Sequence, residues 1–569
     1  MHRAQGGRGP PVTRRARKRG TARGPGAGTP PAPAQGTSAS RITNALAAAA
    51  AFAIAGAVFW PTRGYSFLNW DDHVYVLKNP LIAGFTWAHL RAVFTQPYFQ
   101  NYLPLHLLSY MLDHALWGLW AGGYHLSSVL LHGLNTVLCL AVARRLSGSR
   151  TVGFIAALLF AVHPAHVEAV AWVSSRKEVL STTFLLLSLL AYLRARSGST
   201  LRPVPYAASV AWFLLAMLSK ASVVVLPAFL LLLDWLPDSE SPRAARPPLF
   251  AALASKVPYG MIGAILIAVN SRAQVTAKAA YAHEPLRYLA VKGHAAWNYL
   301  GLLFGFGGSP DYDLPPIGGG TLGMPAQLLG LAVLPVCAYL LLRWKRRTEF
   351  LGTCWVFITL LPALLFPLVT YMADRYLYAP SIGFCWALAA AIVQAGGLDR
   401  AARNWRAALA VAVTAILVVG FSLQTLRYSR VWRDSESLWT YALTKSSDYR
   451  VFNNMAEVRM TQKRWGEAER LLKQGATAEN VTSYQSLGVL YYNLRRFDEA
   501  LAATDRALKI QATRRGEPSL LAELHFNRGA ILWSQGNAAR AIEEWRTALR
   551  EDPGHAPAKE WLGIATAGH

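Results

Sequence analysis

The sequence predicts an all-α membrane protein, with a body of about eleven transmembrane helices followed by a module of helical repeats. Hydrophobic residues make up 53% of the 569 residues and charged residues only 15%, which is the balance of a membrane protein. Apolar runs long enough to cross a hydrocarbon core of ~30 Å recur from about residue 42 to residue 426. Beyond Tyr428 these runs stop, and a helical repeat replaces them.

The first segment, residues 1–41, is rich in Gly, Pro, Ala and Arg and has no apolar periodicity, which is typical of disorder. Residues 1–40 contain eight Lys or Arg and no acid. An organelle transit peptide has a similar composition. Because an apolar span follows directly at Ile42, we interpret the segment as a basic cytoplasmic tail.

The body, residues 42–426, contains eleven predicted spans. They lie near residues 42–60, 124–145, 151–171, 179–195, 204–219, 221–236, 249–270, 325–343, 351–370, 376–396 and 406–425. In this register the inner connections are rich in Lys and Arg, whereas the long outer loop over residues 61–123 has three such residues. The positive-inside rule therefore predicts an outside first loop and an outside C-terminus.

Two further apolar stretches, residues 103–120 and 286–304, carry His, Asp, Arg and Lys side chains. We predict interfacial or re-entrant helices that line an outer cavity. If both stretches crossed the membrane, the count would become thirteen and the middle of the topology would invert.

The net charge of +26 does not indicate nucleic-acid binding, because the basic residues gather in the tail and in short loops. No array of basic and aromatic residues of the kind that binds single strands is present. All four cysteines fall inside predicted spans, so no disulfide framework is indicated. The sequence also has no Walker or dinucleotide-binding glycine motif.

Residues 447–569 have the pattern of tetratricopeptide repeats (TPRs), joined to the body by a predicted linker helix over residues 427–446. The second helix of each of three units opens on a small residue, namely Ala468, Ala500 and Ala541. Their spacings are 32 and 41 residues, against a repeat length of ~34 residues, and the longer second spacing fits an insertion around residues 511–520. Small residues at these positions let paired helices pack closely and stack around a groove. The sequence therefore predicts a protein-binding module of about three repeats.

Several short motifs follow one another along the chain. They are Asn69-Trp70-Asp71-Asp72, Tyr124-His125-Leu126, Leu130-Leu131-His132, His163-Pro164-Ala165-His166-Val167-Glu168, Ser175-Arg176-Lys177-Glu178, Leu218-Ser219-Lys220, Arg375-Tyr376-Leu377-Tyr378 and Trp432-Arg433-Asp434. In this order they resemble the transmembrane and tetratricopeptide-repeat (TMTC) O-mannosyltransferases, and more widely the GT-C glycosyltransferases. The resemblance extends from about residue 42 to the end of the chain.

The resemblance implies a GT-C-like body and an enzyme that moves a sugar, such as mannose, from a polyprenyl-phosphate donor to an extracytoplasmic acceptor. That acceptor would be Ser or Thr of a protein recruited by the repeat module. Such a hexosyltransferase needs no separate cofactor, although a divalent metal is compatible with the chemistry. The expected partners are the lipid bilayer, the polyprenyl-phosphate sugar and the protein acceptor.

Two adjacent acids, Asp71 and Asp72, lie in the outer loop that follows the first span. Sugar transfer needs a base to take the proton of the attacking hydroxyl, and a carboxylate can serve. A neighbouring carboxylate should raise the pKa of one member of the pair. We therefore predict that Asp71 or Asp72 is the catalytic base. The alternative is a pair of solvated acids in a turn or a helix cap.

Cations should lie where negative charge develops on the leaving phosphate. Arg375, Arg176, Lys177 and Lys220 all fall at predicted outer ends of spans, and we predict that they bind the donor phosphate. Arg375 is favoured because a guanidinium can hold two oxygens. It could instead pair with Asp374, and the other cations could anchor to lipid headgroups.

His163, His166 and Glu168 are predicted to line the sugar cavity, since polar groups within spans usually face an interior or a cavity. The resemblance adds Tyr376 and Tyr378, which belong to the Arg-Tyr-Leu-Tyr motif, and Asp311, which is similar to an outer-loop feature of the family. A structural cluster around Pro164 is the alternative for the two histidines. The sequence places no third and fourth ligand beside them, so no metal site is predicted.

Two other functions fit the same sequence. The acceptor could be a lipid-linked glycan or a cell-wall polymer, or the chain could be a membrane-anchored scaffold without catalysis. The composition, rich in Ala, Gly and Arg, suggests a bacterial source. We therefore expect a multi-pass protein of the bacterial inner membrane with the repeat module on the extracytoplasmic side.

Overall fold

The computed structural model describes a chain that is almost entirely helical. The described ranges are 38–197, 200–236, 247–273, 284–315, 323–366, 370–400, 404–476, 480–513 and 518–567. Within these ranges the only strands are β1 (Arg196–Ser197) and β2 (Thr200–Leu201), which pair antiparallel. The prediction of an all-α protein is confirmed.

The first described helix is α1 (Ser38–Phe59), which contains most of the first predicted span. It crosses the boundary between two compact units, residues 1–46 and 47–569. Residues 47–569 carry every feature that bears on function. The basic tail predicted for residues 1–41 lies outside the described residues up to residue 37, so its disorder stays a prediction.

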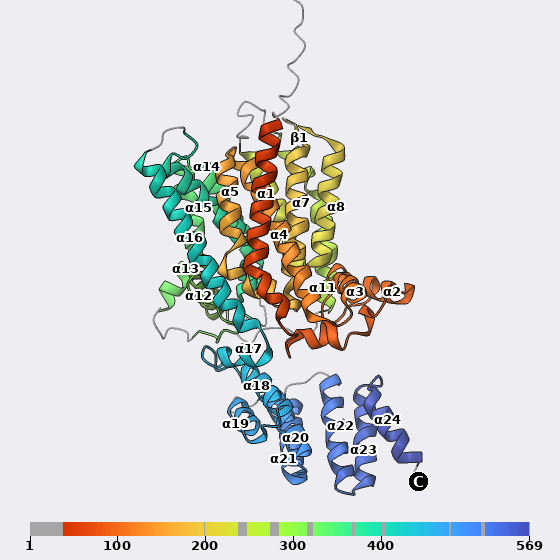
Figure 1. Ribbon diagram of the computed structural model, residues 1–569. Helices are drawn as coiled ribbons and strands as arrows, with labels where there is room; N and C mark the ends of the chain where they lie inside the picture. Colours follow the sequence, from red (N-terminus) through yellow and green to blue (C-terminus); the bar gives the residue numbers. More distant parts are fainter. Residues whose placement is uncertain are drawn as a thin grey trace, which may run out of the picture. The chain divides into compact units, whose positions relative to one another are not determined.

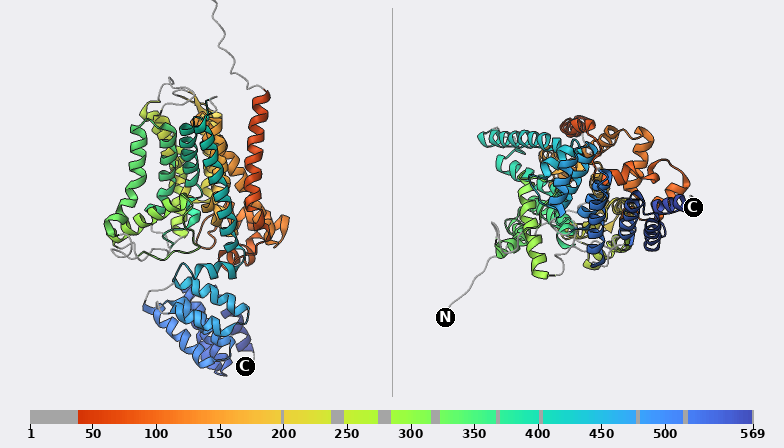
Figure 2. Two further views of the ribbon diagram at one scale, coloured as in Figure 1. Left: turned by 60° about the vertical axis from the view of Figure 1, so that its left-hand side comes forward. Right: turned by 90° about the horizontal axis from the view of Figure 1, so that it is seen from below.

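The membrane body is built from apolar helices. They are α4 (Ala121–Ser147), α5 (Arg150–Ala161), α6 (Val167–Ala171), α7 (Arg176–Ala195), α8 (Pro203–Ser219), α9 (Leu226–Trp235), α10 (Leu249–Ala254), α11 (Val257–Ala273), α13 (Met324–Arg343), α14 (Arg347–Leu365), α15 (Pro380–Gly396) and α16 (Trp405–Ser429). In Figures 1 and 2 the long helices among them run in roughly one direction.

Length and hydropathy identify seven membrane-crossing segments among the described residues. The bent pair Arg150–Ala161 and Pro164–Ala171, with an angle of 55° between its halves, would make an eighth. Three shorter apolar helices lie at Pro203–Ser219, Ala221–Trp235 and Pro380–Gly396. Each of the eleven predicted spans therefore coincides with an apolar helix or helix pair, while length alone assigns only seven or eight of them.

Small residues let neighbouring helices of the body approach closely. Helices α14 and α15 cross where Gly352 meets Gly383, and a Cβ on Gly352 would lie 2.6 Å from the Gly383 carbonyl oxygen. Helix α4 packs against α5 and α7, and α7 packs along α8 (Figure 1). Close approach of this kind is typical of helices that associate inside a membrane.

The two polar helices predicted to be interfacial or re-entrant are α3 (Pro104–Trp117) and α12 (Pro285–Leu303). Neither is among the segments that are long and apolar enough to cross a membrane. Helix α3 and the preceding α2 (Trp87–Thr95) lie crosswise near the lower end of α8 (Figure 1). The alternative with thirteen spans therefore gains no support from the described helices.

Three antiparallel helix pairs form the repeat module. They are α18 (Tyr449–Thr461) with α19 (Trp465–Gly475), α20 (Val481–Asn493) with α21 (Phe497–Thr513), and α22 (Pro518–Ser534) with α23 (Ala538–Glu551), followed by α24 (Ala556–Ala567). Each pair turns through a residue with positive φ, at Lys463, Arg495 and Gly536. The predicted small residues Ala468, Ala500 and Ala541 are fully buried between the helices. The described residues of the module thus form three helix pairs, the number of repeats that the sequence predicts.

The segment between body and repeats, residues 427–446, contains the end of α16, the short turn Arg430–Trp432 and helix α17 (Ser435–Ala442). Asp434 caps α17, because its side chain accepts a hydrogen bond from the Ser437 N–H. This segment brings the repeats against the outer loops of the body.

Candidate functional site

The two adjacent acids of the first outer loop have different environments. Asp72 is fully buried, and both of its carboxylate oxygens accept hydrogen bonds. The Leu68 N–H donates at 3.0 Å and the Ser174 N–H at 3.0 Å, and the Ser174 hydroxyl donates as well. Burial raises the pKa of Asp72 to about 6, against the opposing effect of these hydrogen bonds. Asp72 therefore fastens the loop to the turn that precedes α7.

Asp71 is only half-buried. Among the residues that the structure describes, none forms a hydrogen bond with its carboxylate. Its charge acts on Lys177, at the start of α7, and on the buried ring of Tyr75. A carboxylate in this position keeps its oxygens available to an incoming hydroxyl while a cation lies nearby.

The main cavity of the body lies on the side of α7 to which Lys177 points. It has a volume of about 400 Å³. Three cations line it, Lys177, Lys220 and Arg375, together with the ring of Tyr376 and apolar residues of the surrounding helices. Glu178 is the one carboxylate among its described lining residues. The cavity therefore combines an apolar wall with a positive end, which suits a ligand that has an anionic head and an apolar tail.

Two of the three cations are held by buried carboxylates. Lys220 pairs with Glu178, and Arg375 pairs with Glu168, which also accepts the Arg375 backbone N–H at 2.8 Å. Both cations also lie over the Tyr376 ring, with Lys220 at 5.0 Å and Arg375 at 5.1 Å from its centroid. These contacts fix the positions of the charged groups before any ligand arrives.

Lys177 is held differently from the other two cations. No carboxylate of the described chain lies within ion-pair distance of its Nζ, which stands 5.5 Å from the centroid of the Tyr75 ring. Lys177 is thus the cation whose charge is least compensated at short range.

The structure does not bring Arg176 into this cavity. Its guanidinium is 1% exposed and pairs with Asp113 of α3. It also donates to the Tyr124 carbonyl at 2.6 Å and to the Ser128 hydroxyl at 3.3 Å. Arg176 contacts α3 and α4 instead of the cavity that its neighbour Lys177 lines, and it ties these two helices together.

Three other predicted lining residues lie in the core of the body. His163 contacts the Leu303 carbonyl at 2.9 Å through Nε2, and His166 contacts the Ser381 hydroxyl at 2.7 Å. The Tyr378 hydroxyl lies 2.8 Å from Nδ1 of His132. None of the three lines the main cavity. All three side chains are fully buried in the core of the body.

Asp311 is also away from the cavity. It is buried at the contact with the repeat module, where it pairs with Arg450 at 2.8 Å. Glu168 does not line the cavity either, but it acts on it through Arg375. No group of three His, Cys, Asp or Glu residues in the described ranges is arranged to hold a metal ion.

A stack of tryptophans joins the acid loop to the cations. None of these tryptophans was predicted as a site residue. Trp70 stacks on Trp172 with a centroid distance of 4.4 Å, and Trp172 lies 5.8 Å from Trp432. The Arg375 guanidinium lies 5.3 Å from the centroid of Trp172. Trp70 and Trp432 belong to two of the short motifs of the sequence. A tryptophan in each motif was the signal from which an aromatic contact could have been predicted.

Helix α17 and the first helix of the module, α18, contact the same loop through Asn69, two residues before Asp71. The Asn69 N–H donates to the Ser435 hydroxyl at 2.8 Å, and its amide donates to the Asn454 carbonyl at 3.0 Å. The Trp439 indole N–H donates to Asn69 Oδ1 at 2.6 Å. The acid loop is therefore held from one side by the body and from the other by α17 and α18.

The comparisons with known proteins agree with the two-part organisation. Models of the tetratricopeptide repeat match residues 481–514 and 522–555. The mouse protein named protein O-mannosyl-transferase TMTC3 is 24% identical over 451 residues, which cover 71% of this chain and 47% of that protein. The Drosophila melanogaster protein O-mannosyl-transferase Tmtc3 is 25% identical over 485 residues, covering 70% and 51%. The chain spans about half the length of these relatives.

Solved structures show a weaker likeness. The archaeal oligosaccharyltransferase AglB from Archaeoglobus fulgidus, in complex with an inhibitory peptide and a dolichol-phosphate, gives a TM-score of 0.39 at 11% identity and covers 76% of this chain and 60% of its own. ArnT from Cupriavidus metallidurans, bound to undecaprenyl phosphate, gives 0.34 at 14% identity and covers 72% and 77%. The sequence relatives and the repeat matches confirm the predicted resemblance to the TMTC proteins.

Proposed function

We propose that this chain is an integral-membrane glycosyltransferase that moves a sugar from a polyprenyl phosphate to a hydroxyl group of an acceptor. The observation that carries the proposal is the cavity in which Lys177, Lys220 and Arg375 meet beside the loop of Asp71. An apolar wall with a cationic end fits a lipid phosphate. The names of the sequence relatives favour mannose as the sugar and a protein hydroxyl as the acceptor.

In the proposed reaction the acceptor hydroxyl attacks the anomeric carbon of the sugar. A carbon–oxygen bond forms there while the bond from that carbon to the phosphate oxygen breaks, and the polyprenyl phosphate leaves. The hydroxyl proton passes to a carboxylate, and the cations of the cavity stabilise the charge that gathers on the phosphate. Arg375 keeps guanidinium N–H groups for this purpose, because Glu168 accepts only from its backbone N–H and its Nη1.

We assign the role of base to Asp71 rather than Asp72. Both oxygens of Asp72 are occupied by hydrogen bonds within the protein. Asp71 is half-buried and its carboxylate has no hydrogen-bond partner in the described chain. Asp71 does not line the main cavity itself, so the acceptor would approach from the side of the acid loop and the donor from the side of the cations.

The repeat module would bind the acceptor protein on the same side of the membrane as the acid loop. Its contacts with Asn69 place α17 and α18 next to Asp71. The distribution of Lys and Arg over the loops favours an extracytoplasmic side. A reporter fused to the C-terminus should therefore behave as extracytoplasmic. The bacterial inner membrane remains the location we propose from the composition.

The test of the function is transfer of labelled mannose by the purified full chain. A mannosyl polyprenyl phosphate is offered with a peptide that contains Ser and Thr, and GDP-mannose is offered in parallel as the alternative donor. We expect label on the peptide from the lipid phosphate only. Transfer from GDP-mannose would contradict the donor class, and label on a glycan or lipid would contradict the protein acceptor. Absence of transfer from either donor would favour a scaffold.

A further inference from the structure

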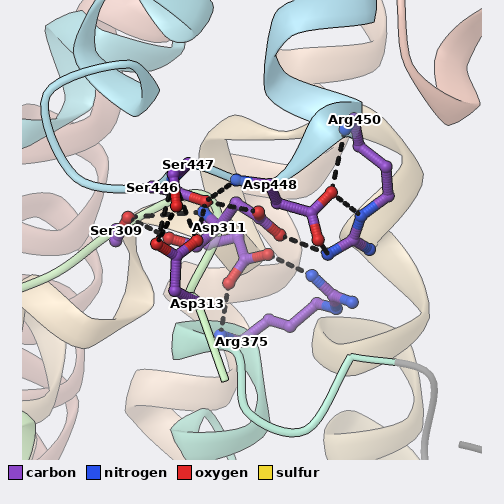
Figure 3. Close-up of polar contacts among 9 residues, drawn as sticks. Ser309, Asp311, Asp313, Arg375, Ser446, Ser447, Asp448 and Arg450 are labelled. Atoms are coloured by element: carbon purple, nitrogen blue, oxygen red, sulfur yellow. Dashed lines mark hydrogen bonds and ion pairs between the residues drawn. The ribbon is translucent and has the colours of Figure 1, made fainter. Parts of the chain in front are cut away.

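The segment that follows α12 makes a polar contact with the start of the repeat module. We call the residues of this contact the junction cluster, and they are Asp311, Asp313, Ser446, Ser447 and Arg450. Asp313 accepts from the Ser446 hydroxyl at 2.6 Å, from the Ser447 N–H at 3.0 Å and from the Ser447 hydroxyl at 2.8 Å. Figure 3 shows the two carboxylates among these donors.

Asp311 joins the same residues from its buried position. It accepts from the Ser446 hydroxyl at 3.0 Å and from the Arg450 guanidinium at 2.8 Å (Figure 3). Burial raises the pKa of Asp311, and the Arg450 charge opposes that effect. Asp448 orients Arg450 by accepting from its Nε at 2.9 Å. A buried carboxylate with a guanidinium and a hydroxyl on its oxygens is a fixed attachment rather than a solvated surface pair.

Tyr312, between Asp311 and Asp313, connects this segment to the residue that precedes Arg375. Tyr312 donates its hydroxyl to Asp374, whose other oxygen accepts from the Tyr428 hydroxyl at 2.9 Å. Asp374 is fully buried and directly precedes Arg375, whose own N–H is held by Glu168 at 2.8 Å. The position of the Arg375 backbone is therefore set by Glu168 on one side and by Tyr312 through Asp374 on the other.

The start of the same segment is fixed by α17, the helix that precedes the module. The Tyr441 hydroxyl of α17 donates to the Gly308 carbonyl at 3.2 Å. Gly308 has a φ of +122°, and a Cβ there would lie 3.1 Å from the Tyr428 ring and 3.3 Å from an Asp374 oxygen. A φ of +122° is strained for any residue with a Cβ, so glycine is favoured here. The segment from Gly308 to Asp313 is thus held by α17 at its start and by the first residues of the module at its end, and it touches Asp374 in between.

We propose that the junction cluster positions Arg375, so that the repeat module is a working part of the phosphate site as well as a recruiter of the acceptor. Asp311, Asp313 and Arg450 are positioning residues in this view, and they do not touch the donor. The role of Arg375 toward the donor rests on the proposed function, whereas the mechanical link between the cluster and Arg375 does not.

A purely structural attachment would make a different prediction. If the cluster only anchors the module, its loss would loosen α18 and leave the backbone around Arg375 unchanged. If the cluster positions Arg375, its loss must also loosen the hydrogen bonds of residues 374–377. Backbone hydrogen exchange measures this directly in the full chain, without donor or acceptor.

The test compares two arginines of the module. Arg450→Gln removes the ion pairs with Asp311 and Asp448, while Arg528→Gln removes those with Asp505 and Glu544 inside the repeats. Both side chains have two acidic partners, and they are 30% and 33% exposed. We expect Arg450→Gln to speed exchange at residues 374–377 by about tenfold or more, and Arg528→Gln to leave it unchanged. Arg450→Lys should restore part of the protection.

Unchanged exchange at residues 374–377 in Arg450→Gln would overturn the proposal, as would an equal change in Arg528→Gln. If Arg450→Gln does not fold, Asp313→Asn tests the same link, because it weakens only the contacts with Ser446 and Ser447. Transfer kinetics provide the second readout, and we expect Arg450→Gln to raise the donor KM. A wild-type chain that transfers no sugar while the exchange result holds would refute the proposed function and leave the link standing.

Discussion

Exchanging each acid of the pair for its amide separates a catalytic role from a structural one. Asp71→Asn keeps the size of a side chain whose carboxylate has no hydrogen-bond partner in the described chain, so stability should hardly change. It removes the proposed base, and general-base catalysis contributes ~10²–10⁴-fold to a rate. At 1.36 kcal/mol for each tenfold, that is about 3–5 kcal/mol of transition-state stabilisation.

Asp72→Asn should have the opposite profile. The amide offers one acceptor oxygen where the carboxylate offers two to Leu68 and Ser174. One buried N–H or hydroxyl therefore loses its partner, which costs about 1–3 kcal/mol of stability. Removal of a buried charge offsets part of that cost. We expect a shifted melting temperature and less than about tenfold loss of transfer per folded molecule, because the loop itself is retained.

The assay is initial-rate transfer of labelled mannose, normalised to folded protein measured by thermal unfolding in the same detergent. The reasoning is refuted if Asp71→Asn transfers at the wild-type rate. It is also refuted if Asp72→Asn loses as much transfer as Asp71→Asn while its melting temperature is unchanged, because Asp72 would then be acting in the chemistry.

Three further predictions follow from the contacts of single residues. Because burial raises the pKa of Asp72 from 3.8 to about 6, its protonated form contributes about 3 kcal/mol of stability that is fully present below pH 3.8 and is lost progressively as the pH rises through 6. About 1.4 kcal/mol of it is left at pH 5 and almost none at pH 8, so the melting temperature of wild type relative to Asp72→Asn should be higher at pH 5 than at pH 8. Lys177→Met should weaken donor binding with little loss of stability, whereas Lys220→Met leaves Glu178 buried without its partner and should lower the melting temperature too. Arg375→Lys keeps the charge but not the paired donors, so transfer should fall at least tenfold in the same assay, and an unchanged rate would contradict the phosphate role.

Much of the fold could be predicted from the sequence because its signals are local. Apolar runs predicted the membrane helices of the body, and the small residues Ala468, Ala500 and Ala541 predicted the helix pairs of the repeats. The number of membrane spans was harder to predict, because three of the apolar helices are shorter than a bilayer crossing requires. Their burial among other helices, which no single segment reveals, decides how they are accommodated.

The site could be predicted only in part, because neighbouring residues of one motif can have different partners. Arg176 and Lys177 are adjacent cations at the start of α7, yet only Lys177 lines the cavity, while Arg176 meets Asp113. Asp71 and Asp72 also differ in their contacts, because only the Asp72 carboxylate accepts hydrogen bonds from the described chain. Sequence identifies the residue types that the chemistry needs, but the direction of each side chain depends on contacts between distant segments, such as Ser174 with Asp72.

Asp311 shows that contacts between distant parts of the chain could not be predicted from the sequence. The sequence identified it as an acid of an outer loop. In the structure it contacts the module, where its partner Arg450 lies 139 positions further along the chain. Pairings at such separations leave no periodic pattern in one sequence. The tryptophan stack was missed for the same reason.

The contact between Asn69 and Trp439 has a consequence for biosynthesis. The two residues are separated by 370 positions in the chain, so during translation the acid loop emerges long before its partner exists. Contacts of this separation form late, because the intervening chain must first be made and ordered. Until α17 follows, Asn69 and Trp70 lack part of their final packing, and the nascent protein holds an incomplete site. The proposed site is thus complete only after the whole membrane body has been synthesised.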